Sequence, residues 1–241
     1  MTTLSSQWRA AGIERGDVVL LHSSSKRTLA THGITPQELL ESFLDAVGAD
    51  GCLVLPAFNF AWCRGDPPSL DQLESEMGVM SERARCDFRF TLTHHPVYRF
   101  AHYGFPRENF RDMNDVDAFG PNTMFDRLLG NDAKIAILDL PDQNAMTLYH
   151  HVEQIVGVSY RFHKSFRRGA RECRVFVRGH GVETDVSGME SLLWERGHYK
   201  GDRPHVGGGL RTIRARAVFD ETSAIIRAGK AEGMLWRRAS A

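Results

Sequence analysis

The chain has 241 residues, of which 42% are hydrophobic and 25% are charged. This balance is typical of a folded globular protein and excludes a disordered or fibrous chain. Its 30 basic and 30 acidic side chains cancel, so no overall field holds a nucleic-acid backbone or an anionic membrane. Chains of this length commonly fold as one α/β unit, and we expect a single domain over residues 1–241.

The N-terminus lacks the basic start and apolar centre of a signal peptide, and no apolar run approaches the roughly 18 residues that span a bilayer. We therefore expect a cytoplasmic protein without nucleic acid or membrane as a partner, and the sequence leaves a homo-oligomer open. Its four cysteines form no C-x-x-C pair, which argues against a zinc cage or a redox dithiol and favours reduced thiols. They are Cys52, Cys63, Cys86 and Cys173.

The first half of the chain reads as alternating helices and strands. Thr35, Pro36 and Glu38 have the pattern of a capping box with proline at the first helical position, so a helix through Val47 is predicted. Apolar runs after glycine-containing turns predict buried strands. The expected strands cover residues 17–22, 52–58 and 134–140, and the other expected helices cover residues 5–11 and 123–129.

The rest of the chain is less regular. Residues 64–119 are rich in Pro, His and Asp and predict loops and short helices over one edge. ECRVFVRG and GGGLRTIRARAVF predict strands, and a last helix is expected from Asp220 to about Trp236. The pattern predicts an α/β fold with a central mixed, partly parallel sheet flanked by helices.

Polar segments follow the three apolar strands. HSSSK follows the first, PAFN ends the second and PDQNAMTLYHHVEQ follows the third. Ligands of open α/β sheets bind beyond the carboxyl ends of the strands. If the strands are parallel, these segments converge on one cleft.

A helix over residues 147–156 places Thr147, His150 and Glu153 on one side, with Gln154, and Leu148, Val152, Ile155 and Val156 on the other. A carboxylate three residues after a histidine can orient the imidazole or stabilise its protonated form, as a general base requires. The alternative is an amphipathic surface helix with a solvated histidine. His151 borders the apolar side, which favours a packed core histidine.

A metal site is the competing interpretation of the histidines. His150, His151, Glu153, His94 and His95 could supply ligands. Adjacent helical histidines point about 100° apart, however, and the i, i+4 spacing of a zinc-binding H-E-x-x-H helix is absent. The sequence favours a site without metal.

An ordered series of segments resembles the aminoglycoside N3-acetyltransferase family. The series is GDVVLLHSSS, GADGCLVLPAF, GVMSERAR, HHPVYRFAHYG, FGPNTMFDRLL with AKIAILDL, and TLYHHVE, over roughly residues 10–165. The resemblance implies that family's fold, an acetyl-CoA or other short acyl-CoA donor, and direct transfer to a small-molecule amine. It assigns the catalytic histidine to His150 and its acidic partner to Glu153.

The resemblance also implies contacts for the cofactor and the acceptor. Ser23, Ser24 and Ser25, with the adjoining Lys26, look like the pantetheine and phosphate contact, although an ordinary loop is the alternative reading. For the oxyanion, a backbone N–H near Ser24 or the hydroxyl of Thr147 is a candidate. No cysteine lies in a nucleophile motif, so no acyl-enzyme is expected.

Candidate acceptor contacts are Phe58, Asn59, His95, Arg161 and Lys164. His94-His95-Pro96 resembles the family's His-Pro turn, but Thr93 departs from its usual lead, and a purely structural turn is the alternative.

The segment YRFHKSFRR is basic and favours an anion, such as the phosphates of coenzyme A or of a nucleotide-linked amino sugar, unless it is only a solvated strand or loop. A cationic aminoglycoside is the alternative acceptor, because three acidic residues could bind it: Asp112, Asp115 and Asp117.

Three functions follow in order of preference. The first is an acyl-CoA-dependent N-acyltransferase on an amino sugar, free or nucleotide-linked, with an aminoglycoside N3-acetyltransferase as its alternative. The second is a metal-dependent hydrolase, and the third is a fold that binds ligand without catalysis.

Overall fold

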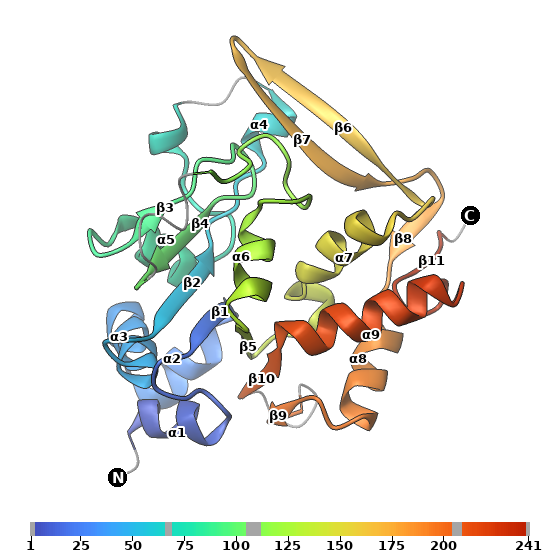
Figure 1. The fold of residues 1–241 in the computed structure, drawn as a ribbon. Coiled ribbons are helices and arrows are strands. Elements are labelled where there is room, and N and C mark those ends of the chain that lie inside the picture. Colours follow the sequence, from blue (N-terminus) through green and yellow to red (C-terminus); the bar gives the residue numbers. More distant parts are fainter. Residues whose placement is uncertain (1–2, 66–68, 105–111, 204–208, 240–241) are drawn as a thin grey trace.

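A mixed sheet lies at the centre of the protein (Figure 1). The computed structural model describes residues 3–65, 69–104, 112–203 and 209–239. Within these ranges seven strands form the sheet in the order β3-β4-β2-β1-β5-β10-β9. The strands are β1 (Val18–Ser23), β2 (Cys52–Pro56), β3 (Thr91–Leu92), β4 (Phe100–Tyr103), β5 (Lys134–Leu138), β9 (Lys200–Gly201) and β10 (Leu210–Arg214).

The three apolar strands that the sequence predicts are neighbours and run parallel. β1 pairs with β2 on one side and with β5 on the other. β4 and β10 then join antiparallel at the two outer sides of this group. The predicted mixed, partly parallel sheet is therefore confirmed, and the carboxyl ends of β1, β2 and β5 share one edge.

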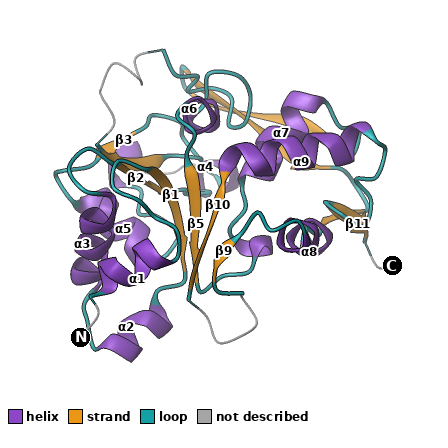
Figure 2. Cartoon of the chain, turned by 60° about the horizontal axis from the view of Figure 1, so that its bottom comes forward, coloured by secondary structure: helices purple, strands orange, loops and turns teal. Residues whose placement is uncertain are grey.

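Helices cover both faces of the sheet (Figure 2). Side chains of β1 alternate between the two cores, since Val19 and Leu21 join one cluster and Leu20 joins the other. The first cluster packs against α1 (Leu4–Ala10), α3 (Pro36–Val47) and α5 (Val79–Cys86); the second packs against α6 (Met124–Gly130), α7 (Leu148–Val156), α8 (Ser187–Glu195) and α9 (Ala215–Arg227).

The helix predicted from the capping box is present. Glu38 N–H donates to Thr35 Oγ1, and the Glu38 carboxylate accepts from Thr35 N–H at 2.8 Å. A helix that the sequence reading missed, α2 (Lys26–His32), begins directly after β1. Its N-cap residue is Ser25, a residue type typical of helix starts, although the side chain makes no capping hydrogen bond.

Residues 64–119 depart from the expectation of loops and short helices. They follow α4 (Ala61–Arg64) and include the 3₁₀ turn η1 (Leu70–Gln72) and α5, but also β3 and β4, which extend the sheet beyond β2. β4 has only four residues, too few to show a period. Residues 66–68 and 105–111 of this segment lie outside the described residues.

The prediction for the last helix is wrong. Helix α9 begins at Ala215, within the run that was predicted as strand, and ends at Arg227. Gly229, with a φ of 69°, ends the helix in a left-handed turn. Trp236–Arg238 instead form strand β11, which pairs with β8 (Val182–Thr184). Of the predicted GGGL segment, residues 207 and 208 lie outside the described ranges.

A long hairpin of β6 (Arg161–Arg168) and β7 (Arg171–Arg178) follows α7 and runs from the end of that helix to α4 (Figure 1), where Arg168 donates to the Gly65 carbonyl at 2.9 Å. β7 lies where ECRVFVRG predicts a strand. In the described part of the chain, no helix combines the length and the apolar character needed to cross a membrane.

Candidate active site

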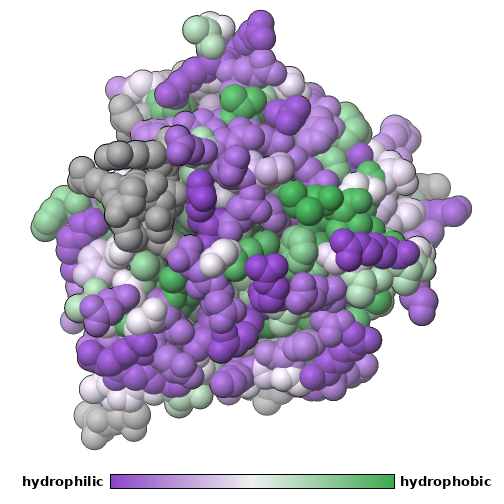
Figure 3. Space-filling model, viewed as in Figure 1, coloured by the Kyte–Doolittle hydropathy of each residue, from purple (hydrophilic) through white to green (hydrophobic). Residues whose placement is uncertain are grey.

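The helix α7 carries the two residues that the sequence selects for acid–base chemistry. It begins after Thr147 and ends at Val156, before Gly157, whose φ is 85°. The predicted division of its faces is only partly correct, because Glu153 is 1% exposed while Ile155 is 40% exposed. Glu153 is buried because the start of β6 lies against it. On the outer side of α7, Figure 3 shows an apolar area on an otherwise largely hydrophilic face.

His150 and Glu153 are in direct contact. His150 Nδ1 lies 2.8 Å from Glu153 Oε2, and 24% of the imidazole side chain is exposed. An ionised carboxylate only accepts, so Nδ1 carries a proton, and in the neutral imidazole the basic nitrogen is then Nε2. The Phe119 ring meets the imidazole edge to face at a centroid distance of 5.5 Å. The imidazole thus has a fixed orientation and one basic nitrogen.

The Glu153 carboxylate has further partners beyond α7. Tyr160 donates its hydroxyl to Oε1 at 2.9 Å, and Arg161 Nε forms an ion pair with Oε2 at 2.7 Å. Burial raises the pKa of Glu153, but the hydrogen bond and charge of His150, the charge of Arg161 and the Tyr160 hydroxyl outweigh it. The pKa of Glu153 therefore lies below its ordinary value, and the buried group is a carboxylate at neutral pH.

His151 is a core histidine, as the sequence favours. Its ring is fully buried, and its Nδ1 lies 2.7 Å from the Phe119 carbonyl oxygen. Burial lowers the pKa of His151. Since the ring packs between Phe125 and Phe219, it holds α7 against α6 and α9.

A cavity of about 610 Å³ lies at the carboxyl end of β1. This volume falls within the range of small-molecule sites, roughly 300–1,000 Å³. All four predicted cofactor residues, Ser23–Lys26, line the cavity, together with Leu29, Glu76, Met77, Gly78, Val79, Leu140 and Asn144. Leu140 and Asn144 belong to the segment that connects β5 to α7. One connection therefore joins the cavity to the helix of His150.

The two oxyanion candidates differ in the structure. Ser24 N–H donates to the Leu138 carbonyl at 2.8 Å, which extends the pairing of β1 with β5. That N–H is not available to an oxyanion, so within this segment the N–H groups of Ser25 and Lys26 remain as candidates. Thr147 is half-buried at the start of α7, and its side chain makes no capping bond. Its hydroxyl remains a candidate.

Phe58 and Asn59 follow β2 and hold the segment that carries Glu76, whose N–H donates to the Phe58 carbonyl at 2.9 Å. Asn59 Nδ2 donates to the Glu74 carbonyl at 2.8 Å, and Asn59 Oδ1 accepts from Ala61 N–H. The Phe58 ring is buried and packs edge to face on Tyr98. Both residues shape the protein around the cavity, and neither lines it.

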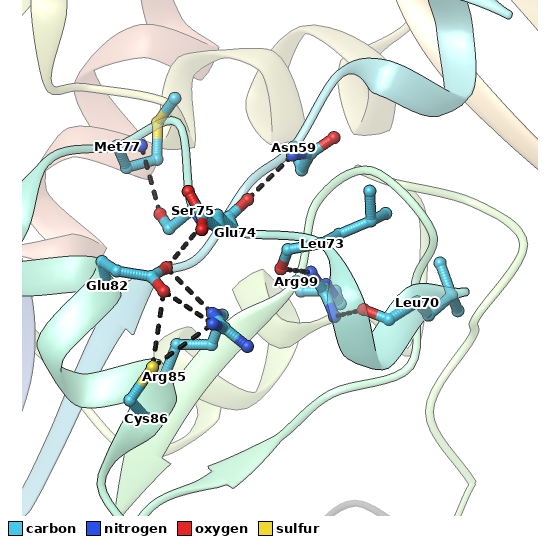
Figure 4. A network of polar contacts seen from close by, with 10 residues as sticks. All are labelled: Asn59, Leu70, Leu73, Glu74, Ser75, Met77, Glu82, Arg85, Cys86 and Arg99. Carbon is cyan, nitrogen blue, oxygen red and sulfur yellow. Dashed lines mark hydrogen bonds and ion pairs between the residues drawn. The ribbon is translucent and has the colours of Figure 1, made fainter. Parts of the chain in front are cut away.

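The segment 70–77 is held from below by a polar network (Figure 4). The buried Arg99 donates to the carbonyl oxygens of Leu70 and Leu73, and Glu82 accepts from Ser75 N–H at 2.7 Å. Arg85 in turn holds the Glu82 carboxylate. Because Glu76 and Met77 line the cavity, this network fixes one of its walls.

The other predicted acceptor residues are dispersed. His95 Nδ1 accepts from the backbone N–H groups of Val97 and Tyr98, and burial lowers the pKa of His95 to about 4. The structure thus gives His95 the turn-holding role that the sequence left open. Lys164 lies exposed on β6 with its ammonium 5.1 Å from the Phe166 ring centroid.

Arg161 is tied to Glu153, so the basic segment contributes less positive charge to an anion site than the sequence suggests. Asp117 is likewise engaged, with Arg174 and Gln154. Among the residues that the structure describes, no three His, Cys, Asp or Glu side chains are grouped so that they could hold a metal ion.

Tyr160 and Thr184 were missed by sequence reasoning. Tyr160 lies seven residues after Glu153, beyond the end of α7, and Thr184 reaches Arg161 from β8. No local motif marks such long-range partners. The one available signal was the adjacency of Tyr160 to the basic segment.

Solved acetyltransferase structures share this fold. A structure described as AAC-IIIb binary with CoASH has a TM-score of 0.74 at 17% identity, covering 95% of this chain and 96% of that one. The apoenzyme of AAC(3)-IVa has a TM-score of 0.75 at 21% identity, covering 95% of this chain and 88% of that one. AAC-VIa bound to sisomicin has a TM-score of 0.74 at 18% identity, with 95% and 97% covered. The fold is that of the AAC(3) acetyltransferases.

The sequence comparisons identify the family. The model described as aminoglycoside 3-N-acetyltransferase matches residues 20–221. The chain belongs to the aminoglycoside 3-N-acetyltransferase family.

Two curated relatives match over part of their length. Aminoglycoside N(3)-acetyltransferase VIII of Streptomyces fradiae is 29% identical over 164 residues, which cover 60% of this chain and 57% of the relative. Aminoglycoside N(3)-acetyltransferase IX of Micromonospora chalcea is 26% identical over 175 residues, with 63% and 60% covered. The match thus spans less than two thirds of each relative's length.

Proposed function

We propose that this protein is an acyl-CoA-dependent N-acyltransferase that transfers an acetyl or other short acyl group to the amine of an amino sugar. The observation that carries the proposal is the contact of His150 Nδ1 with Glu153 Oε2 at 2.8 Å, in a chain of the aminoglycoside 3-N-acetyltransferase family. His150 is the general base, and Glu153 is its partner.

The chemistry is aminolysis of a thioester. The neutral acceptor nitrogen attacks the carbonyl carbon, and His150 Nε2 takes the proton that the nitrogen loses. Glu153 stabilises the imidazolium through Nδ1–H. Collapse of the tetrahedral intermediate breaks the C–S bond, and the imidazolium gives its Nε2 proton to the departing sulfur, which releases the thiol of coenzyme A and restores the neutral base. General-base assistance of this kind is typically worth about 10²–10⁴ in rate.

The cavity beside Ser23–Lys26 is the proposed site of the acyl-CoA. Its volume suits an extended arm, and the exposed Lys26 offers a cation to a phosphate. Leu140 and Asn144 continue from this cavity toward α7, so a thioester at its inner end would approach the helix of His150. The Thr147 hydroxyl, at the start of that helix, is the proposed oxyanion donor.

An aminoglycoside is the first acceptor to test, because both curated relatives carry that substrate in their names. The engagement of Arg161 by Glu153 removes one cation from the segment that favoured a nucleotide-linked amino sugar. Such sugars form the second arm of the screen.

The test is a thiol-release assay with acetyl-CoA and longer acyl-CoA donors against sisomicin, gentamicin and nucleotide-linked amino sugars. His150→Ala is expected to lower kcat by at least about 100-fold. The matched control is His180→Ala, an exposed histidine between β7 and β8. An unimpaired His150→Ala variant would remove the base assignment, and activity lost on chelation would favour a metal-dependent hydrolase instead. Coenzyme A binding without turnover of any acceptor would favour a binding protein.

A further inference from the structure

Arg161 connects the catalytic helix to two other elements. It is the first residue of β6, and its side chain is 4% exposed. Its Nε lies 2.7 Å from Glu153 Oε2, and its Nη2 donates to Thr184 Oγ1 of β8 at 2.7 Å. The guanidinium is thus held by an ion pair with Glu153 on one side and by a hydrogen bond to Thr184 on the other.

The Glu153 carboxylate has a distinct partner arrangement on each oxygen. Oε2 faces both His150 Nδ1 and Arg161 Nε, and Oε1 accepts from the Tyr160 hydroxyl. Burial raises the pKa of Tyr160, and the charge of Glu153 raises it further, so Tyr160 stays a donor. With both oxygens engaged, the carboxylate cannot rotate away from His150 without breaking contacts to β6.

We infer that Arg161, held by Thr184, is a positioning residue for acyl transfer, which keeps Glu153 ionised and its Oε2 directed at His150. This inference rests on the proposed function, in which His150 is the base. It assigns Arg161 to the pair on α7 in place of an acceptor contact.

The charge balance around Glu153 predicts the direction in which the pH–rate profile moves when Arg161 is replaced. Neutral His150 with ionised Glu153 carries one negative charge, which Arg161 balances. The titratable groups placed against Glu153 are His150 on α7, Tyr160 just before β6 and Arg161 itself. Without the guanidinium, the buried anion binds a proton more tightly, so the protonated, inactive pair persists to higher pH. The acid limb of the pH–rate profile must then move upward.

The experiment compares Arg161→Gln, Arg161→Lys and Thr184→Val with wild type, using acetyl-CoA and sisomicin. The matched control is Arg178→Gln, because Arg178 lies directly opposite Arg161 in the hairpin but is exposed. We expect Arg161→Gln to lower kcat at least about ten-fold, with the KM for acetyl-CoA within about two-fold, and to raise the acid limb by about one pH unit. Arg161→Lys should restore part of kcat, and Thr184→Val should cause a smaller loss in the same direction.

A second measurement does not depend on turnover. Histidine-selective ¹⁵N NMR of the unliganded protein follows protonation of the His150 imidazole, with His150→Ala for assignment. The resonances are expected to titrate over a higher pH range in Arg161→Gln than in wild type or Arg178→Gln. An unchanged titration in a folded Arg161→Gln variant overturns the inference, whatever the acceptor screen shows. A changed titration in a protein that acylates none of the acceptors supports the positioning role and counts against the proposed function alone.

Discussion

Removing the buried arginine of β10 should destabilise the protein far more than removing an exposed arginine of the same strand. Arg211 is 1% exposed, and it donates to Asp142 Oδ1 at 2.7 Å and to the Leu140 carbonyl at 2.6 Å. Arg214, three residues on, pairs with Asp132 at the surface, where its side chain is 57% exposed. Both residues are arginines of β10 that pair with an aspartate, and the two positions differ in burial.

Arg211→Met leaves the Asp142 carboxylate buried without its counter-charge. Breaking a buried pair from one side costs about 3–5 kcal/mol of unfolding free energy. For a chain of this size that corresponds to a fall in Tm of about 6–20 °C. Arg214→Met should cost at most about 1 kcal/mol, because exposed pairs are screened by water.

The assay is urea and thermal unfolding of both variants, followed by circular dichroism at one pH and salt concentration. The Tyr149 and Tyr199 hydroxyls also meet Asp142, so they remain as its partners in Arg211→Met. If Arg211→Met unfolds within about 1 kcal/mol of Arg214→Met, these hydroxyls suffice and the reasoning from burial is refuted.

Two further predictions concern the transfer reaction. Cys63→Ser/Cys86→Ser should keep its activity, because burial raises the pKa of both thiols and direct transfer needs no thiolate; loss of thiol release in the folded variant would indicate an acyl-enzyme. Lys26→Ala should raise the KM for acetyl-CoA about ten-fold at unchanged kcat, as loss of one charged contact predicts. Its neighbour Arg27 lines a different cavity, so Arg27→Ala is the control, and equal KM values for the two variants would place the cofactor elsewhere.

Local signals explain what the sequence could predict of the fold. The helix from Thr35 was predictable because its capping box lies within four residues. The parallel strands were predictable because strands buried on both faces are continuously apolar. α9 was misplaced because Ala215–Phe219 follow β10 without a Gly or Pro and continue its alternation of basic and apolar residues, whereas in the structure they form the first turns of a helix that packs Val218 into the core.

Long-range contacts explain what could not be predicted of the site. The spacing of three residues on one helix correctly predicted that His150 and Glu153 are in contact. Helical periodicity placed Glu153 on the polar side, yet the chain returns after α7 and covers it with Tyr160 and Arg161. Arg161 was read as an acceptor contact because its charge, and not its partner, is visible in sequence.

The dependence of Glu153 on β6 and β8 has a consequence for synthesis on the ribosome. The chain emerges from its N-terminus, so α7 is complete before Arg161 and Thr184 have been made. A nascent chain that ends after α7 and before Arg161 would contain His150 and Glu153 but not the residues that hold the Glu153 carboxylate in place. The contacts that hold the Glu153 carboxylate therefore form only after the strands that follow α7 have been synthesised.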